Sequence, residues 1–274
     1  MTMQTSWIYS ISSDIGAALA ERRLDRGDRV AGTFRTESEK TRKLAQRGAH
    51  LTALDLMDPA SVEAATRELH ECAGPFDECI VAPGTLEPIG TFAETAWHAW
   101  ESSWRINFTG QLQAVHAALP HRRPGALILF FAGGGTNGAP TRVSAYTASK
   151  IALIKMTELL QAEIPDARCC ILGPGWVDTK IHQEMLRAGE RAAEHLLATR
   201  EKLRSGDCVA MNEVLDCIDW IASQPGEVIG GRNLSVAHDD WRAPDFADRL
   251  RGDADVARLR RHANNLLNRK SARV

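Results

Sequence analysis

Residues 8–20, IYSISSDIGAALA, predict the end of a buried strand, a tight turn and the start of a helix. A strand, a glycine-rich turn and a helix whose free N–H groups face a pyrophosphate form a dinucleotide-binding loop. In this stretch only Gly16 stands where three glycines are expected. The stretch therefore predicts the opening of an α/β fold and raises the question of whether its turn still holds a nucleotide.

Strand-length apolar runs alternate with amphipathic helical segments through the first 240 residues. Near-continuous hydrophobicity is typical of parallel strands that are buried on both faces. The pattern predicts an α/β fold, a Rossmann-like doubly wound parallel sheet of about seven strands with helices on both faces. The expected strands fall within residues 6–11, 29–35, 50–56, 76–84, 126–133, 168–175 and 233–239.

Two segments depart from this rhythm, and we expect a single domain over residues 1–240 followed by a basic extension over 241–274. Residues 181–206 are a polar helical insertion, which we interpret as a lid. The extension holds nine Lys and Arg against four Asp, with a helical pattern over 257–270. It is interpreted either as a solvated or subunit-packing tail or as a cationic flap over an anionic substrate.

Composition excludes several classes of protein. With a formal net charge of −2 and a pI near 6.5, no global field recruits nucleic acid or an anionic membrane. The amino-terminal residues show no signal-like pattern and no stretch reaches membrane-spanning length, so we expect a cytoplasmic protein. The six cysteines lack CxxC spacing and the nine histidines lack HxH or HExxH spacing. Buried reduced thiols and no metal site are therefore expected.

The segment SAYTASK, residues 144–150, contains the strongest chemical signal. Tyr146 and Lys150 are four residues apart on an expected helix, so they share one face. At about 4 Å and an effective dielectric near 20, an ammonium would favour the phenolate by roughly 4 kcal/mol, about three pKa units. We expect this pair to lower the pKa of Tyr146 toward neutrality, although such spacing alone is usually incidental.

The order of motifs makes the pair informative. With the opening turn, Asn107 in WRINFTG and the segment PGWVDT at 174–179, residues 5–240 resemble the short-chain dehydrogenase/reductase family. The resemblance implies that Tyr146 is the general acid/base and that Lys150 lowers its pKa and holds the nicotinamide ribose. It implies that Asn107 supports a proton-relay water, whereas without the other motifs Asn107 reads as a polar residue on an amphipathic helix.

The resemblance also assigns cofactor contacts. In the turn, Gly16 keeps the close approach of helix to strand, while Ser10 brings a side chain to the tightest point, which tilts the loop or strains the residue. Asp14 would repel a pyrophosphate unless it points outward and caps the helix. Asp55 matches the acid near the adenine amino group, or it simply caps the next helix. The implied contacts are Ser10, Ser12, Ser13, Ile15, Gly16, Asp55, Leu56, Gly84, Tyr146, Lys150, Pro174, Gly175, Val177 and Thr179.

Cofactor choice is read at the end of the second strand. Phe34 occupies the position where an acid would accept hydrogen bonds from a ribose 2′-hydroxyl, and Arg35 follows it. A guanidinium suits a 2′-phosphate, and Thr36 and Ser38 add donors. NADP(H) is therefore expected rather than NAD(H), which remains the alternative.

One departure from the family lies at Gly133, where the family places a serine thirteen residues before the tyrosine. Loss of one donor to the reacting oxygen costs on the order of 10²-fold or more in rate. Thr136 is our candidate replacement, with Asn137 and Ser144 as further options. Backbone N–H groups of residues 133–135 could also form an oxyanion nest, and the glycines would leave room for a bulky substrate.

The sequence thus predicts an NADP(H)-dependent oxidoreductase that acts on a carbonyl or hydroxyl carbon, with a sugar, nucleotide-linked or phosphorylated polyol as the favoured substrate class. The alternatives are a catalytically impaired nucleotide-binding regulatory protein of the same fold and a partner-binding scaffold. By the resemblance, helices around residues 109–120 and 149–163 would form a homodimer or homotetramer, although their apolar faces could equally belong to the core.

Overall fold

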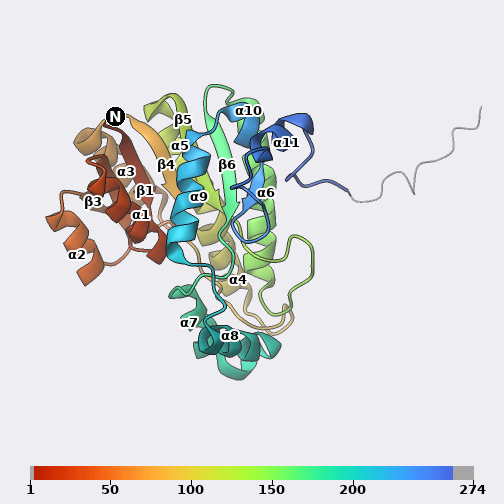
Figure 1. Ribbon diagram of the computed structural model, residues 1–274. Coiled ribbons are helices and arrows are strands. Elements are labelled where there is room, and N and C mark those ends of the chain that lie inside the picture. Colours follow the sequence, from red (N-terminus) through yellow and green to blue (C-terminus); the bar gives the residue numbers. More distant parts are fainter. Residues whose placement is uncertain (1–2, 262–274) are drawn as a thin grey trace, which may run out of the picture.

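A computed structural model describes residues 3–261 and contains one seven-stranded, entirely parallel sheet (Figure 1). The strand order is β3-β2-β1-β4-β5-β6-β7, which confirms the predicted doubly wound sheet. The order reverses between β1 and β4, so a ligand crevice is expected beyond their carboxyl ends. The strands are β1 (Thr5–Tyr9), β2 (Arg29–Phe34), β3 (His50–Ala53), β4 (Phe76–Val81), β5 (Arg122–Phe131), β6 (Arg168–Gly173) and β7 (Asn233–Ser235).

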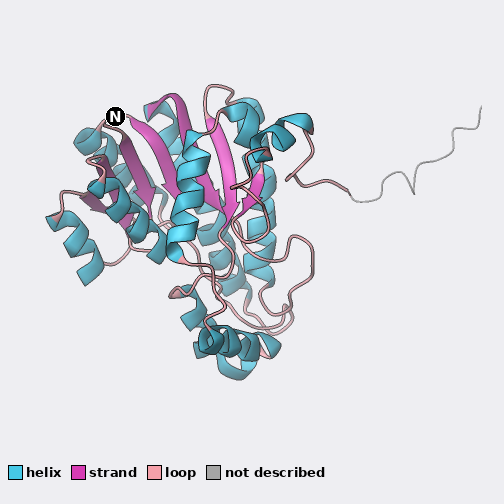
Figure 2. Cartoon of the chain, viewed as in Figure 1, coloured by secondary structure: helices cyan, strands magenta, loops and turns pink. Residues whose placement is uncertain are grey.

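Helices cover both faces of the sheet (Figure 2). The α-helices are α1 (Asp14–Asp25), α2 (Glu39–Gln46), α3 (Pro59–Ala73), α4 (Trp97–Trp104), α5 (Gly110–Ala118), α6 (Ser144–Glu163), α7 (Ile181–Ala188), α8 (Glu194–Ser205), α9 (Met211–Ser223), α10 (Gly226–Ile229) and α11 (Phe246–Gly252). A π-helical turn η1 (Arg105–Thr109) joins α4 to α5, and η2 (Leu119–His121) and η3 (Gly189–Ala192) are 3₁₀ turns.

Alternate strand residues enter two apolar clusters, one on each face of the sheet. Ile8 and Leu129 pack with α1 and α9, whereas Tyr9 and Phe130 pack with α3, α5 and α6. Because both faces are covered, the strands contain apolar residues at successive positions, as the sequence predicted.

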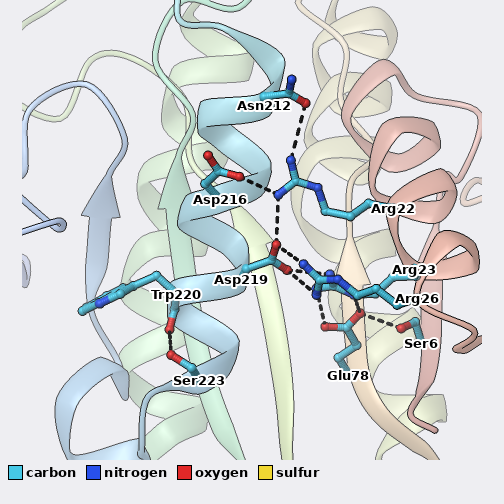
Figure 3. A network of polar contacts seen from close by, with 10 residues as sticks. All are labelled: Ser6, Arg22, Arg23, Arg26, Glu78, Asn212, Asp216, Asp219, Trp220 and Ser223. Carbon is cyan, nitrogen blue, oxygen red and sulfur yellow. Dashed lines mark hydrogen bonds and ion pairs between the residues drawn. The ribbon is translucent and has the colours of Figure 1, made fainter. Parts of the chain in front are cut away.

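An ion-pair network ties α1 and α9 to the amino-terminal half of the sheet (Figure 3). Arg23, on α1, donates from Nε to Glu78 Oε1 at 2.6 Å and from Nη2 to Glu78 Oε2 at 3.0 Å. Its Nη1 reaches Asp219 of α9 at 2.6 Å, and Ser6 also donates to Glu78 at 2.6 Å. Arg23 and Glu78 are both buried. Their charges are tolerated there because hydrogen bonds replace the hydration that each group loses on burial.

The predicted insertion over 181–206 is helical and lies beyond the carboxyl ends of the strands, where Figure 1 shows α7 and α8. Trp241, Phe246 and Leu250 are buried in the α1/α9 cluster, so the packed core continues past the boundary predicted at residue 240. Residues 257–261 are not helical, and the rest of the helical pattern predicted over 257–270 lies outside the described residues. Membrane-spanning helices are absent from the part of the chain that the structure describes.

Four cysteines, Cys79, Cys169, Cys170 and Cys217, are buried free thiols, as expected. Cys208 is half-buried. The expectation is wrong for Cys72, which is exposed because it lies on the solvent side of α3 near the end of that helix.

Candidate functional site

Tyr146 lies in the first turn of α6, directly against the backbone of the loop that follows β5. A Cβ atom added at Gly133 would lie 2.6 Å from Tyr146 Oη and 2.7 Å from the nearest ring carbons. The phenol therefore fills the space that a side chain at residue 133 would need. The expectation that this glycine leaves room for a bulky substrate is wrong, because the tyrosine itself takes the room.

Lys150 lies one helical turn later and is buried. Its Nζ donates to the Phe131 carbonyl at 2.9 Å and lies 5.9 Å from the centroid of the Tyr146 ring. Burial lowers the pKa of Lys150 to about 8. The Phe131 carbonyl at the end of β5 thus holds the Lys150 ammonium near the Tyr146 ring.

The predicted lowering of the tyrosine pKa is wrong for this arrangement. Burial, and then the charge of Glu184, raise the pKa of Tyr146 to about 12. The prediction assumed an ammonium about 4 Å from the phenol oxygen, whereas Lys150 is directed to a backbone carbonyl. Tyr146 is consequently a neutral phenol at pH 7.

Asn107 lies in η1, and its side chain is fully buried. Its Oδ1 accepts the Thr85 N–H at 3.0 Å, and its Nδ2 donates to the Thr85 carbonyl at 2.9 Å and to Ser103 Oγ at 3.1 Å. Asn107 is thus a polar residue of a helical turn that is buried rather than exposed to solvent. Its amide fixes the loop after β4 at the carboxyl end of the sheet, and its role toward a relay water stays a prediction.

Glu184 on α7 is a site residue that the sequence did not reveal. It accepts hydrogen bonds from Thr85 Oγ1 at 3.0 Å and from the Leu86 N–H at 2.6 Å. Glu184 and Asn107 therefore both hold the loop after β4, through hydrogen bonds to Thr85 and Leu86. No local signal marks Glu184, since it is one of several charged residues in a polar helix and the loop lies about 98 positions away in the chain.

The side chains proposed to replace the missing serine do not reach the phenol. Thr136 and Asn137 are exposed and make no side-chain hydrogen bond within residues 3–261. Ser144 instead accepts the Trp100 Nε1–H at 3.2 Å. The prediction of Thr136 as a catalytic residue therefore gains no support from its position, because the phenol already occupies the space beside Gly133.

Trp100 belongs to an aromatic stack along α4. The ring centroids of Trp97 and Trp100 are 5.3 Å apart at an interplanar angle of 6°, and those of Trp100 and Trp104 are 5.6 Å apart at 13°. Trp100 links this stack to α6, because it donates to Ser144, the first residue of the helix that bears Tyr146.

The turn after β1 has the strain that its sequence predicts. Ser10 adopts φ 62°, and its N–H donates to Thr33 Oγ1 at 3.1 Å. Ser13 caps α1 by accepting the Gly16 N–H at 3.0 Å. A Cβ atom at Gly16 would lie 2.6 Å from the Ser10 carbonyl, so only glycine allows this approach of helix to strand.

Asp14 does not cap α1, because Ser13 does. Its carboxylate accepts Lys40 Nζ at 2.6 Å and the Lys180 N–H at 2.7 Å, and Lys180 Nζ donates to the Ser12 carbonyl at 2.8 Å. Burial raises the pKa of Asp14, but the bonds from Lys40 and Lys180 outweigh it, so the net shift is downward.

The residues assigned to the adenosine end lie around the carboxyl ends of β2, β3 and β4. Arg35 is exposed and makes no hydrogen bond or ion pair within the described chain. Asp55 is exposed and accepts the Met57 N–H at 2.9 Å, while Asp58 caps α3, so the capping alternative for Asp55 is wrong. The Leu56 side chain is buried. A Cβ atom at Gly84 would meet only ordinary contacts at 3.7 Å and 3.8 Å.

The segment after β6 packs against α7 and the residues before α9. Gly175 has φ 76°, and a Cβ atom there would lie 2.7 Å from Val209 Cγ2, so this glycine is sterically required. Pro174 precedes it, Val177 is buried, and Thr179 Oγ1 donates to the Val177 carbonyl at 3.3 Å. Trp176 stacks on His182 of α7, with centroids 3.8 Å apart.

The described part of the basic extension divides in two: Arg242 pairs with Glu213 in the first turn of α9, near the loop after β6, whereas the later arginines lie elsewhere. Arg260 pairs with Glu158 in the second half of α6 at 2.7 Å, and Arg258 donates to the Gly230 carbonyl at 3.0 Å. Glu158 is twelve residues along the helix from Tyr146, toward the opposite edge of the sheet. The cationic-flap interpretation is thus wrong for Arg258 and Arg260, it stays a prediction for Arg242, and residues 262–274 lie outside the described residues.

Comparison with known proteins agrees with this geometry. A family model described as enoyl-(acyl carrier protein) reductase matches residues 11–238. An uncharacterised oxidoreductase of Schizosaccharomyces pombe is 27% identical over 168 residues, which are 60% of this chain and 66% of that protein. In dehydrogenase/reductase SDR family member 7B of Mus musculus, the matched part is only 42% of that protein's length.

Solved structures share the fold. A short-chain dehydrogenase/reductase from Saccharomyces cerevisiae superposes with a TM-score of 0.77 at 21% identity, over 89% of this chain and 98% of that one. Actinorhodin polyketide ketoreductase, crystallised as a variant with NADPH, gives 0.76 at 21% identity, over 90% and 98%. With the family model matching most of its length, this chain belongs to the short-chain dehydrogenase/reductase family of oxidoreductases.

Proposed function

We propose that this protein transfers hydride between NADP(H) and a carbonyl or secondary hydroxyl carbon, with Tyr146 as the proton donor or acceptor. The observation that supports this most is the position of Tyr146 Oη at the carboxyl end of β5. Lys150 lies below it, and the loop fixed by Asn107 lies at the end of the neighbouring strand β4.

The residues at this edge fit a dinucleotide. The first N–H groups of α1 face the crevice, Gly16 allows the backbone to come close, and Ser12 and Ser13 supply polar groups. Arg35, exposed and without an ion pair within residues 3–261, suits a 2′-phosphate and supports NADP(H) over NAD(H). When bound, the nicotinamide supplies or accepts the hydride.

The chain's own groups favour the reductive direction. With a pKa of about 12, Tyr146 holds its proton at pH 7 and can give it to a carbonyl oxygen as that oxygen gains negative charge. Lys150, with a pKa of about 8, is mostly cationic at pH 7 and would stabilise the resulting phenolate. In oxidation the same proton returns from the alcohol to Tyr146.

The surroundings of the phenol indicate the substrate class. The Tyr146 ring packs against an apolar cluster formed by Leu86, Ile89, Val143, Met185, Ala188 and Ala192. The polar residues Thr136 and Asn137 that favoured a sugar or phosphorylated polyol are exposed, and Arg258 and Arg260 of the basic tail are engaged away from the phenol. We therefore propose a ketone, or the matching secondary alcohol, flanked by apolar groups.

Replacement of Tyr146 by Phe tests the proposal. Because the proton donor is removed, kcat for NADPH-dependent ketone reduction should fall by roughly 10²–10⁴-fold while the Kd for NADP⁺ changes little. The chain provides a matched control in its only other tyrosine, Tyr9, whose hydroxyl meets Thr66 Oγ1 at 2.9 Å inside the core.

Tyr9→Phe should lose roughly 1 kcal/mol of stability and keep its kcat. Equal turnover by wild-type and Tyr146→Phe protein would refute the assignment of the proton donor. Tight NADP⁺ binding without turnover on a panel of apolar ketones would favour the regulatory alternative instead.

A further inference from the structure

A single carboxylate connects three segments at the nucleotide end of the crevice. Asp14, the first residue of α1, bonds to Lys40 of α2 and to the Lys180 N–H directly before α7. Lys180 returns the contact through Nζ, which donates to the Ser12 carbonyl in the turn itself. The turn, α2 and the lid thus meet at one cluster of charges, defined here as the Asp14 cluster: Asp14, Lys40 and Lys180.

The cluster lies where the proposed cofactor would place its phosphates. The amino-terminal end of α1 favours an anion, and Asp14 supplies one from within the chain. Arg35, at the end of β2, is a third cation in this region: burial lowers the pKa of Lys180, and the charges of Lys40 and Arg35 lower it further. A phosphate that displaced the carboxylate would therefore meet cations already gathered around it.

Asp14 would otherwise be difficult to explain. A carboxylate beside a pyrophosphate weakens binding by repulsion, and α1 already has its cap in Ser13. Lys40 Nζ forms an ion pair with the Asp14 carboxylate, whereas Lys180 bonds to that carboxylate through its backbone N–H and directs its Nζ to the Ser12 carbonyl. Asp14 therefore balances the Lys40 charge directly and the Lys180 charge from nearby when no phosphate is bound. Within residues 3–261, neither Nζ forms an ion pair with any other carboxylate.

We propose that Lys40 and Lys180 are phosphate-binding residues for NADP(H), and that Asp14 is their resident counter-ion, which a cofactor phosphate displaces. This inference rests on the proposed function. Lys40 follows β2, whose end faces the adenosine ribose, so it serves the 2′-phosphate. Lys180 lies over Ser12 in the turn, so it serves the pyrophosphate.

Binding titrations with NADP⁺ and NAD⁺, followed by calorimetry at two salt concentrations, test the assignment. Lys40→Gln should weaken NADP⁺ binding about tenfold and NAD⁺ binding less than threefold. Lys180→Gln should weaken both about tenfold. Asp14→Asn should tighten NADP⁺ binding about tenfold, since it removes the repulsion and releases the Lys40 ammonium from its ion pair, and added salt should reduce each effect.

Two matched controls separate this role from a general charge effect. Lys43 lies on α2 and pairs with Glu39, and Lys202 lies on α8 and pairs with Asp207. Lys43→Gln and Lys202→Gln should leave both affinities within twofold of wild type. Hydrogen exchange of the cofactor-free protein provides a second readout: in Asp14→Asn the Lys180 amide should exchange faster, because a neutral amide oxygen is a weaker acceptor than the carboxylate.

Unchanged or weaker NADP⁺ binding by Asp14→Asn, or lysine variants that match the controls, would overturn the inference while leaving the proposed function intact. Lysine-dependent NADP⁺ binding by a protein that turns over no ketone would support the inference and contradict the proposed function. Wild-type protein that binds neither dinucleotide would overturn both.

Discussion

The charged residues near the amino-terminal ends of the strands and those near the carboxyl ends are arranged in opposite ways. In the amino-terminal half, Arg23 and Glu78 are buried and bonded to each other and to neighbours that stay in place. At the carboxyl edge, Lys150 is buried with one carbonyl acceptor, and Asp14 holds its cations at a partly exposed surface. The first arrangement stabilises the fold, whereas the second leaves cations able to meet a ligand.

The turn after β1 combines partly exposed charge with backbone strain. Ser10 has positive φ there, a conformation that costs an L-residue roughly 1–2 kcal/mol, and Asp14 pairs with Lys40 close by. Changes in the amino-terminal half should therefore reduce stability without changing chemistry, and changes at the carboxyl edge should do the reverse.

The largest effect is expected from Glu78→Gln. The substitution leaves Arg23 with a buried charge that has lost its bidentate partner, so the free energy of unfolding should fall by about 3–5 kcal/mol. Urea unfolding measures the loss. Glu39→Gln, which breaks the fully exposed pair with Lys43, should leave the midpoint unchanged. A Glu78→Gln protein as stable as wild type would remove the distinction between the two edges.

Gly133→Ser, which restores the family's usual residue, should reduce activity rather than improve it. The new Cβ atom would lie 2.6 Å from Tyr146 Oη, so the phenol must move or the loop must shift, at about 1–3 kcal/mol. Gly134→Ser is the control, because no atom lies within 4 Å of a Cβ atom there. Ketone reduction that is faster in Gly133→Ser than in the control would show that the phenol is placed differently in solution.

The rate of ketone reduction should fall above pH 8. Burial lowers the pKa of Lys150 to about 8, so the charge that stabilises the phenolate is lost above that value. Because the folded pKa lies below the unfolded value of about 10.4, the stability that Lys150 contributes rises with pH between about 8 and 10.4. A pH series of kcat and of unfolding midpoints tests both signs. Lys155→Ala, on the same helix, should keep the falling limb, and Lys150→Met should lose it.

The smallest effect is expected from Ser10→Gly. Glycine relieves the strain at φ 62° but adds freedom to the unfolded chain, so the net gain is roughly 0.5–1 kcal/mol. Ser12→Gly, two residues later, has no positive φ to relieve and should lose stability. Differential scanning calorimetry compares the two. A loss in Ser10→Gly would indicate that the Ser10 side chain compensates for its own strain.

The sequence was sufficient for the seven-stranded sheet. Strands buried on both faces are rich in apolar residues, so the seven strands could be predicted without tertiary information. Tyr146, Lys150 and Asn107 received their roles from the order of the motifs, and these roles stay predictions. Their distances and protonation were not predictable, since these depend on where the Lys150 Nζ points within a packed core.

Contacts between residues far apart in the chain could not be predicted from the sequence. Asp14 and Lys180 are 166 positions apart, so the sequence predicted only that Asp14 would repel a pyrophosphate or cap the helix. The role of Gly133 was ambiguous for another reason. The absence of a side chain can mean that the space beside the glycine is open to a substrate or that a neighbouring residue fills it. Only the coordinates of Tyr146 distinguish the two.

The indole stack along α4 gives the molecule a spectroscopic probe of its own. Nearly parallel rings 5.3 Å and 5.6 Å apart couple electronically, so their near-ultraviolet circular dichroism depends on their mutual orientation. Because Trp100 donates to Ser144, two residues before Tyr146, a displacement of that helix end would alter the signal without any label.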